Sequence, residues 1–385
     1  MRIGIFISGR QPEEGGGYTI TYDIFNQLIK KIKKKKNFIF ILLNDNNNYL
    51  KNKLKTLDLD YKDFKEKRLI TNIKNFLFCY IPILIKFYRF FRRDKFFEFQ
   101  KKENIQLVWF ISAEYHYPLF NKYYATVWDL MHITHPNFKE TGSFFAKIYR
   151  GTVISSFLKN SDKIITGTKF LKKKLINLYN LKSKNIILAP HPTPNFFIKK
   201  KLSLKNNLSN YFLYPANFWE HKNHFNLING FNNFNRKQDF KYNLILVGSV
   251  KDRKYYNKII DLINKTKSYQ NIKIFNFVSI NRLLNLYDSC KALVYASYCG
   301  PENLPPLEAF ARNKPVLCSL YDGAKEQLKN YPIYFNPSNP LSIENSFQSF
   351  VLTNPKKKYK QFAVKRNVSK YVYLIYKKIL YSNKV

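Results

Sequence analysis

The chain has 385 residues, of which 66 are lysine or arginine and 25 are aspartate or glutamate, giving a formal net charge of +41. This length is too great for one ordinary hydrophobic core and predicts two domains of roughly 150–200 residues. The charge favours contact with polyanions, acidic lipids or nucleotides. An A/T-biased coding sequence, which enriches lysine on solvated faces, accounts for the charge equally well.

The cysteines and the first residues argue against a secreted protein. No two cysteines form a C-x-x-C pair, and each stands alone among apolar residues, as buried thiols in a reducing cytosol do: Cys79, Cys290, Cys299 and Cys318. We therefore expect neither a disulfide nor a zinc site. The apolar run at residues 3–7 is too short for a secretory signal and predicts a first strand. We expect a cytoplasmic protein.

The longest apolar run, FLFCYIPILI at residues 76–85, is interrupted by Pro82. It is shorter than the roughly 20 residues of a membrane-spanning helix. Basic side chains follow it up to residue 95. The combination fits an interfacial element on the anionic inner face of the plasma membrane, and equally a buried helix with a basic edge.

The first half of the chain alternates apolar strands with helical patterns. The strand at 3–7 is followed by Gly15, Gly16 and Gly17 and then by a helical pattern over 20–32. Further strands are predicted at 38–43, 105–111, 124–128, 161–166 and 185–188. Strands alternating with helices indicate a doubly wound parallel sheet. The glycines let backbone N–H groups approach a ligand, and a simple turn explains them equally well.

A Pro-, Lys- and Asn-rich stretch at 189–210 is the predicted linker. A second α/β half follows it, and an amphipathic final helix is predicted at 368–380. We therefore predict an acceptor-side domain at 1–190, a second domain at 191–365, and a C-terminal helix at 366–385 that returns to the first domain. Two such halves suggest that a ligand is held in a cleft between them.

One stretch of the second half, ASYCGPENLPPLEAF at residues 296–310, predicts a strand end, a Gly/Pro loop and a helix beginning near Pro305. In α/β proteins, ligands bind outside the carboxyl ends of parallel strands, and phosphates bind at helix N-termini. Glu308 places a carboxylate one turn into this helix among apolar neighbours. Such a carboxylate is suited to hydrogen-bond sugar hydroxyls.

A second stretch, YPANFWEHKNH at residues 214–224, predicts a strand end followed by a loop and a helix start. Lys222 in this loop can neutralise a diphosphate whose remaining charge rests on the helix N-terminus. Taken alone, a lysine in a loop is usually solvated. Together with Glu308 in another βα unit of the same half, Lys222 is predicted to bind phosphate.

These two stretches resemble the C-terminal half of glycosyltransferase family 4, the retaining GT-B enzymes. The order of elements extends the similarity over nearly the whole chain, with less specific motifs in the first half. The resemblance implies two Rossmann-like, doubly wound parallel-sheet domains facing a cleft. It also implies a nucleotide diphosphate sugar bound mainly by the second domain, an acceptor bound mainly by the first, and no required metal or other cofactor.

The resemblance assigns roles to residues near the donor sugar. Glu308 matches the second glutamate of the family's E-x7-E motif, which is expected to bind the ribose hydroxyls. The first glutamate falls at Gly300, which departs from the family pattern. Either Glu302 substitutes for it, or backbone groups of Asn303 and Leu304 hold the sugar hydroxyls and phosphate.

At the diphosphate end, Lys222 matches the family's lysine, whereas Asn217 stands where an arginine is usual. One positive charge is therefore missing, and His221 or a neighbouring lysine is expected to compensate.

In the first half, TVWDLMHITHP at residues 126–136 resembles the family's His-Asp segment. Trp128 replaces the commoner histidine, and Asp129 is kept. Asp129 is predicted to orient an acceptor hydroxyl or a donor sugar, and an N-cap for the following turn is the structural alternative. His132 lies about one helical turn further on, and an ordinary loop histidine would look the same.

The sequence thus predicts a retaining hexosyltransferase that acts on a saccharide or lipid-linked acceptor in surface polysaccharide, lipopolysaccharide or glycolipid synthesis. The variant with glycine at residue 300 resembles a subgroup of the family, and this resemblance weakly favours GDP-mannose as the donor. Its catalytic groups would be Asp129, Lys222 and Glu308. Gly16, Gly17, Asn217, His221, Glu302, Asn303 and Leu304 would assist donor binding. The alternatives are a catalytically inactive scaffold subunit and, from the charge alone, a nucleic-acid-binding protein, for which no known module is visible.

Overall fold

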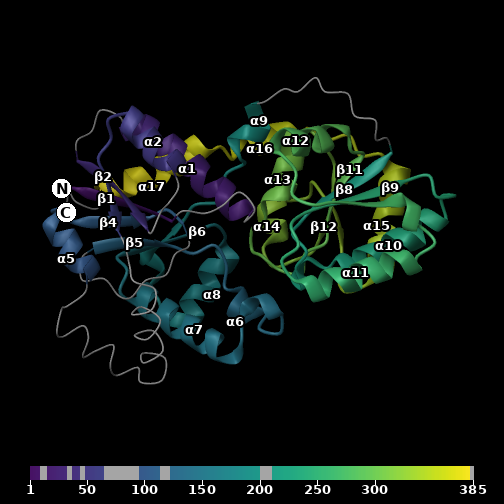
Figure 1. The fold of residues 1–385 in the computed structure, drawn as a ribbon, viewed down its shortest axis with the longest axis horizontal. Helices are drawn as coiled ribbons and strands as arrows, with labels where there is room; N and C mark the ends of the chain where they lie inside the picture. The colour runs from purple at the N-terminus through teal and green to yellow at the C-terminus, as the bar shows by residue number, and fades with distance from the viewer. Residues whose placement is uncertain are drawn as a thin grey trace. The chain divides into compact units, whose positions relative to one another are not determined.

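The computed structural model describes residues 1–8, 15–32, 37–43, 48–64, 95–112, 122–199 and 210–381. The chain divides into two compact units, one formed by Met1–Ala189 with Val372–Val385 and the other by Pro190–Tyr371 (Figure 1). The predicted boundaries fall after residues 190 and 365, whereas the two units meet after residues 189 and 371. The apolar run at 76–85, its basic continuation to 94 and Cys79 lie outside the described residues.

The first unit is built on a seven-stranded sheet in the order β3-β2-β1-β4-β5-β6-β7, with every neighbouring pair parallel. Its strands are β1 (Ile3–Ser8), β2 (Phe38–Leu43), β3 (Tyr61–Phe64), β4 (Leu107–Phe110), β5 (Lys122–Thr126), β6 (Lys163–Thr166) and β7 (Ile186–Leu188). Its helices are α1 (Gly16–Ile32), α2 (Asn48–Thr56), α5 (Lys95–Lys102), α6 (Met131–Thr134), α7 (Phe144–Lys159), α8 (Lys169–Tyr179) and most of α17 (Val368–Tyr381).

The continuous apolar sequence of β2 is explained by burial of both of its faces, as is usual for a parallel sheet. Phe38 stacks on Tyr376 of α17, and Phe40 meets Phe25 of α1 edge to face. Ile39 and Ile41 point the other way, into the core shared with α7 and α8. Figure 1 shows α1 and α17 on one side of this sheet and α7 and α8 on the other.

The second unit is built on a six-stranded parallel sheet in the order β10-β9-β8-β11-β12-β13. Its strands are β8 (Tyr211–Pro215), β9 (Asn243–Val247), β10 (Ile272–Phe275), β11 (Ala292–Tyr295), β12 (Val316–Ser319) and β13 (Ile333–Phe335). Its helices are α9 (Asn195–Lys199), α10 (His224–Arg236), α11 (Arg253–Lys265), α12 (Ile280–Ser289), α13 (Leu304–Ala311), α14 (Ala324–Leu328), α15 (Pro340–Thr353) and α16 (Tyr359–Lys365).

In the second sheet the strand order reverses between β8 and β11. Later strands add outward from β8 on one side and from β11 on the other. This is the switch point where doubly wound sheets bind ligands, at the carboxyl ends of the strands. The predicted fold class of two doubly wound parallel sheets is confirmed.

The linker predicted at 189–210 is wrong for its first part. Residues 195–199 form helix α9, and Phe197 is buried against Tyr287 of α12. Thr193 pairs with Asn367 in an isolated parallel bridge. Proline, lysine and asparagine dominate the composition of this stretch, so the single buried phenylalanine that holds it was not recognised.

Cys290, Cys299 and Cys318 are buried, as predicted. No helix within the described part of the chain has the length and apolar character needed to cross a membrane.

Candidate donor-binding site

The loop after β8 presents Lys222 at the switch point. A short 3-10 turn, Glu220–Lys222, leads into α10, and Asn223 between them has a left-handed φ of 59°. The Asn223 side-chain amide donates to the carbonyl of Ala296 at 3.2 Å and to that of Pro337 at 2.7 Å. The turn that carries Lys222 is therefore fastened to the loops after β11 and β13, and α10 begins directly after it.

Two tyrosines hold Lys222 itself. The hydroxyl of Tyr214 donates to the main-chain carbonyl of Lys222. The Lys222 ammonium donates to the hydroxyl oxygen of Tyr295 at 3.1 Å, and the Tyr295 hydroxyl donates to Asn303 Oδ1 at 2.7 Å. His221 is buried, and its carbonyl accepts from the amide of Tyr298 at 2.9 Å.

The backbone explains why this chain has glycine where the family pattern has glutamate. Gly300 adopts a φ of 109°, in the left-handed region that favours glycine. A Cβ at this position would lie 3.0 Å from Nδ2 and Oδ1 of Asn303. The Asn303 side chain also donates to the Gly300 carbonyl at 3.1 Å. A glutamate at residue 300 would therefore be strained in this loop.

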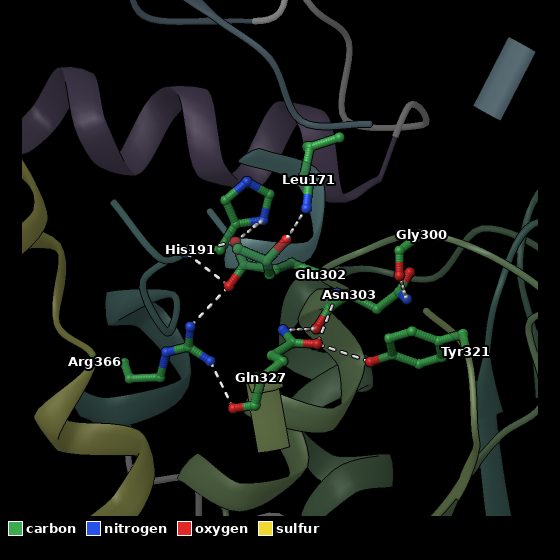
Figure 2. Close-up of polar contacts among 9 residues, drawn as sticks. Leu171, His191, Gly300, Glu302, Asn303, Tyr321, Gln327 and Arg366 are labelled. Atoms are coloured by element: carbon green, nitrogen blue, oxygen red, sulfur yellow. Dashed lines mark hydrogen bonds and ion pairs between the residues drawn. The ribbon is translucent and has the colours of Figure 1, made fainter. Parts of the chain in front are cut away.

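Asn303 is bonded through its main chain as well as its side chain. Its amide donates to Gln327 Oε1 at 3.0 Å, and its carbonyl accepts from Gln327 Nε2 at 2.7 Å (Figure 2). Tyr321 donates to the same Gln327 oxygen at 2.7 Å. The backbone groups of Asn303 that were predicted to hold the donor are thus bonded within the unit, whereas Leu304 begins helix α13.

Glu302 is the buried partner of a partly buried ion pair. Its side chain is 1% exposed, Arg366 donates to Oε1 at 2.7 Å, and the amide of His191 lies 3.1 and 3.0 Å from its two carboxylate oxygens. Figure 2 shows Arg366 reaching from Glu302 to Gln327, whose carbonyl accepts from Arg366 Nη1 at 2.8 Å. Glu302 therefore joins segments of the second unit and is not placed to replace the glutamate expected at residue 300.

Glu308 lies in the second turn of α13 and is 7% exposed. The hydroxyl of Tyr287 on α12 donates to its Oε2 at 2.6 Å. Burial raises the pKa of Glu308 to about 7, and the hydrogen bond from Tyr287 opposes that rise. A carboxyl with such a pKa can accept or donate hydrogen bonds near neutral pH.

Asn217 holds two loops together at the position where an arginine was expected. Its Oδ1 accepts from the amide of Ser249 at 2.9 Å, which ties the end of β8 to the loop after β9. Gly248 allows this close approach, because a Cβ there would lie 2.1 Å from the carbonyl oxygen of Ala216. The missing positive charge is not replaced at this position.

The remaining predicted residues belong to the first unit. Gly16 and Gly17 open α1 after the central strand β1, and the Gly17 carbonyl accepts from the Thr21 hydroxyl at 2.8 Å. Asp129 is exposed after β5, and its Oδ1 accepts from the amide of Met131 at 3.0 Å. The N-cap of α6 is Leu130, so Asp129 is not the cap and its side chain instead bonds the backbone two residues on, as in an Asx turn.

His132 is 6% exposed. Its pKa is lowered to about 4 by burial and by the charge of Arg150, against a smaller opposite effect of Asp129. The imidazole is therefore neutral at physiological pH. Its Nε2 has no hydrogen-bond partner among the described residues.

Sequence reasoning missed Tyr295, Gln327 and Arg366, which connect the site residues. A sequence signal was available for Tyr295 and also for Tyr214. Each is a tyrosine at or next to the last residue of an apolar strand, β11 and β8 respectively. Arg366 gave no such signal, because its partner Glu302 lies 64 positions away.

Residues 195–366 match the family model described as glycosyl transferases group 1. This matched segment, which makes up most of the second unit, is similar to that family. The resemblance to glycosyltransferase family 4 is thereby confirmed for the half of the chain that carries the two motifs. The switch-point loops with Lys222 and Glu308 lie within the matched glycosyltransferase segment.

Three similar proteins extend the comparison. The O-antigen chain mannosyltransferase RfbU of Salmonella typhimurium is 30% identical over 235 residues, which span 60% of this chain and 62% of RfbU. Sucrose-phosphate synthase from Thermosynechococcus elongatus superimposes with a TM-score of 0.70 at 15% identity, covering 100% of both chains. Anabaena HepE in complex with UDP gives a TM-score of 0.67 at 14% identity, covering 98% of this chain and 99% of HepE. The structural matches show the GT-B fold over nearly the whole chain.

Proposed function

We propose that this chain is a retaining glycosyltransferase that moves a hexose from a nucleotide diphosphate sugar to a saccharide or lipid-linked saccharide. Surface polysaccharide or lipopolysaccharide synthesis is the proposed setting, and mannose is the favoured hexose because RfbU is named an O-antigen chain mannosyltransferase. The observation that carries the proposal is the placement of Lys222 at the switch point, fixed by Tyr214 and Tyr295 in front of α10.

The proposed chemistry follows from the charges at this point. When the bond between sugar and diphosphate breaks, negative charge develops on the leaving phosphate. The Lys222 ammonium and the positive end of the α10 helix dipole would stabilise that charge. The acceptor oxygen would attack from the face that the diphosphate leaves, and the diphosphate would take its proton. Glu308 would bind the ribose hydroxyls, and Asp129 would orient the acceptor.

Donor binding is the first test. We expect the purified chain to bind GDP or UDP in the presence of EDTA, because we propose that no metal is required. Lys222→Ala and Glu308→Ala should each weaken that binding about tenfold, or about 1.4 kcal/mol. Isothermal titration calorimetry measures the effect. Lys258→Ala, which removes an exposed lysine of α11, is the matched control and should bind like the wild type.

Unchanged nucleotide binding in both site variants would contradict the proposed site. A chain that binds the donor yet neither hydrolyses nor transfers its sugar would be the inactive scaffold. DNA binding that nucleotide sugars do not displace would favour the nucleic-acid alternative.

We also propose that the first unit contacts an anionic membrane, where a lipid-linked acceptor would lie. The first turns of α7 expose Phe144 by 71%, Phe145 by 61% and Ile148 by 43%. Exposed Lys139 precedes the helix in the turn Lys139–Thr141, whereas exposed Arg150 lies on another face of α7. Exposed aromatic side chains with a cation close in sequence suit the interface of an anionic bilayer.

A further inference from the structure

The hydroxyl of Tyr295 has a place in the second unit that packing does not require. Tyr295 ends β11, Tyr214 lies near the end of β8, and their rings meet edge to face with centroids 5.9 Å apart. A phenylalanine would serve this ring contact equally well. The hydroxyl adds the two hydrogen bonds to Lys222 and Asn303.

The direction of these bonds is fixed by chemistry. A lysine ammonium has only donors, so the Tyr295 oxygen must accept from Lys222. The single Tyr295 proton is then directed to Asn303 Oδ1. Because Asn303 Oδ1 accepts this proton, the side-chain nitrogen of Asn303 is the atom that donates to the Gly300 carbonyl. Three bonds run in one direction from the lysine to the glycine loop, an arrangement in which each bond strengthens the next.

Burial of Tyr295 keeps these three hydrogen bonds in the direction described. Tyr295 is 2% exposed, and burial raises the pKa of its phenol even though the charge of Lys222 opposes the rise. The phenol therefore retains its proton at neutral pH. The Lys222 ammonium also lies 5.6 Å from the centroid of the Tyr295 ring, within the range of a cation–π contact.

We propose that Tyr295 is a positioning residue. It aims the Lys222 ammonium at the donor diphosphate and aligns residues 300–303 with that ammonium. This inference rests on the proposed function. Asn217 takes the place of an arginine at this end of the site, so the placement of Lys222 matters more than it would beside a second cation. Misplacement of a catalytic charge by about 1 Å can cost a factor of about 100 in rate.

Tyr295→Phe removes one oxygen and keeps the ring. We expect it to weaken GDP or UDP binding about tenfold, because a hydrogen bond to a charged group is lost. Tyr211→Phe is the matched control, since Tyr211 is a fully buried tyrosine of the neighbouring strand β8 whose hydroxyl donates to the Leu286 carbonyl at 2.7 Å. Calorimetry on the control should give wild-type affinity.

A double-mutant cycle tests whether Tyr295 acts through the lysine. In a Lys222→Ala background, Tyr295→Phe should cause no further loss of affinity, because the two side chains act as a unit. A second tenfold loss in that background would overturn the proposal, and so would unchanged binding in Tyr295→Phe alone.

A measurement without nucleotide separates this inference from the proposed function. The rate at which acetic anhydride acetylates Lys222, followed by mass spectrometry, should rise in Tyr295→Phe and stay unchanged in Tyr211→Phe. An unchanged acetylation rate in both variants would overturn the inference that Tyr295 restrains the Lys222 ammonium. If the wild-type chain bound no nucleoside diphosphate, the proposed function would fail and the diphosphate would be excluded as the target of Lys222. Faster acetylation of Lys222 in Tyr295→Phe would still establish that Tyr295 restrains the Lys222 ammonium.

Discussion

Glu308 combines a charge with an environment that disfavours it. Its carboxylate lies between α13 and α12, where Tyr287 donates the hydrogen bond already described. Burial raises its pKa to about 7 from the ordinary value of 4.5. The folded chain therefore binds a proton at Glu308 between these two pH values, whereas the unfolded chain has released it. Stability from this group is complete below about pH 4.5 and is lost as pH rises through about 7.

Glu308→Gln should remove this dependence. The shift corresponds to at most about 3 kcal/mol of unfolding free energy, so we expect the variant to gain stability over the wild type at pH 8 relative to pH 5. Urea unfolding at the two pH values measures the difference. The same pH response in wild type and Glu308→Gln would contradict the assignment.

At the scale of single residues, sequence could place Lys222 and Glu308 because each stands at a fixed offset from a strand end and a helix start. It could not find Tyr295 or Arg366, whose roles depend on partners 73 and 64 positions away. Nor could it foresee that Glu302 is ion-paired, since a carboxylate in a glycine loop looks the same whether its partner is a ligand or an arginine.

At the scale of elements, the loop between β11 and α13 is joined to both ends of the second unit. Glu302 binds the amide of His191, next to the first residue of the unit, and Arg366, which follows α16. The Thr193 hydroxyl donates to the Ala363 carbonyl at 2.8 Å and ties these two ends to each other. The predicted donor loop therefore depends on segments that sequence analysis assigned partly to a linker and partly to a separate C-terminal helix.

Glu302→Gln should loosen this junction. It leaves the partly buried guanidinium of Arg366 without its counter-charge, at a cost of up to roughly 3 kcal/mol. We expect faster hydrogen–deuterium exchange at residues 191–193 and 300–304. Glu344→Gln breaks a more exposed ion pair, with Lys237 just beyond the C-terminal end of α10, and should leave exchange in those segments unchanged. Equal protection in wild type and Glu302→Gln would contradict the role of the ion pair.

The strands were the most predictable elements. Runs such as FIFILL and NLILV are apolar throughout because both faces of a parallel sheet are buried. The short helix α9 was not predictable, since five residues with one buried phenylalanine have no helical period.

At the scale of the whole molecule, the net charge of +41 and the exposed aromatics of α7 carry the membrane proposal. Phe144→Ser combined with Phe145→Ser should lower binding to anionic vesicles about tenfold, because the apolar area that would enter the bilayer is lost. Vesicle flotation with phosphatidylglycerol and with phosphatidylcholine measures it. Leu352→Ser, which alters a side chain 85% exposed on α15, is the control. Equal flotation with neutral and anionic vesicles would rule out the electrostatic part.

The return of the chain to the first unit at Val372 has a consequence for the order of folding. The second unit is one continuous stretch, and its two ends meet where Thr193 pairs with Asn367. The first unit is made from two stretches, because Tyr376 of α17 supplies the ring that covers Phe38 of β2. During synthesis the second unit can therefore be completed before the first, in which Phe38 and its part of the sheet stay uncovered until α17 leaves the ribosome.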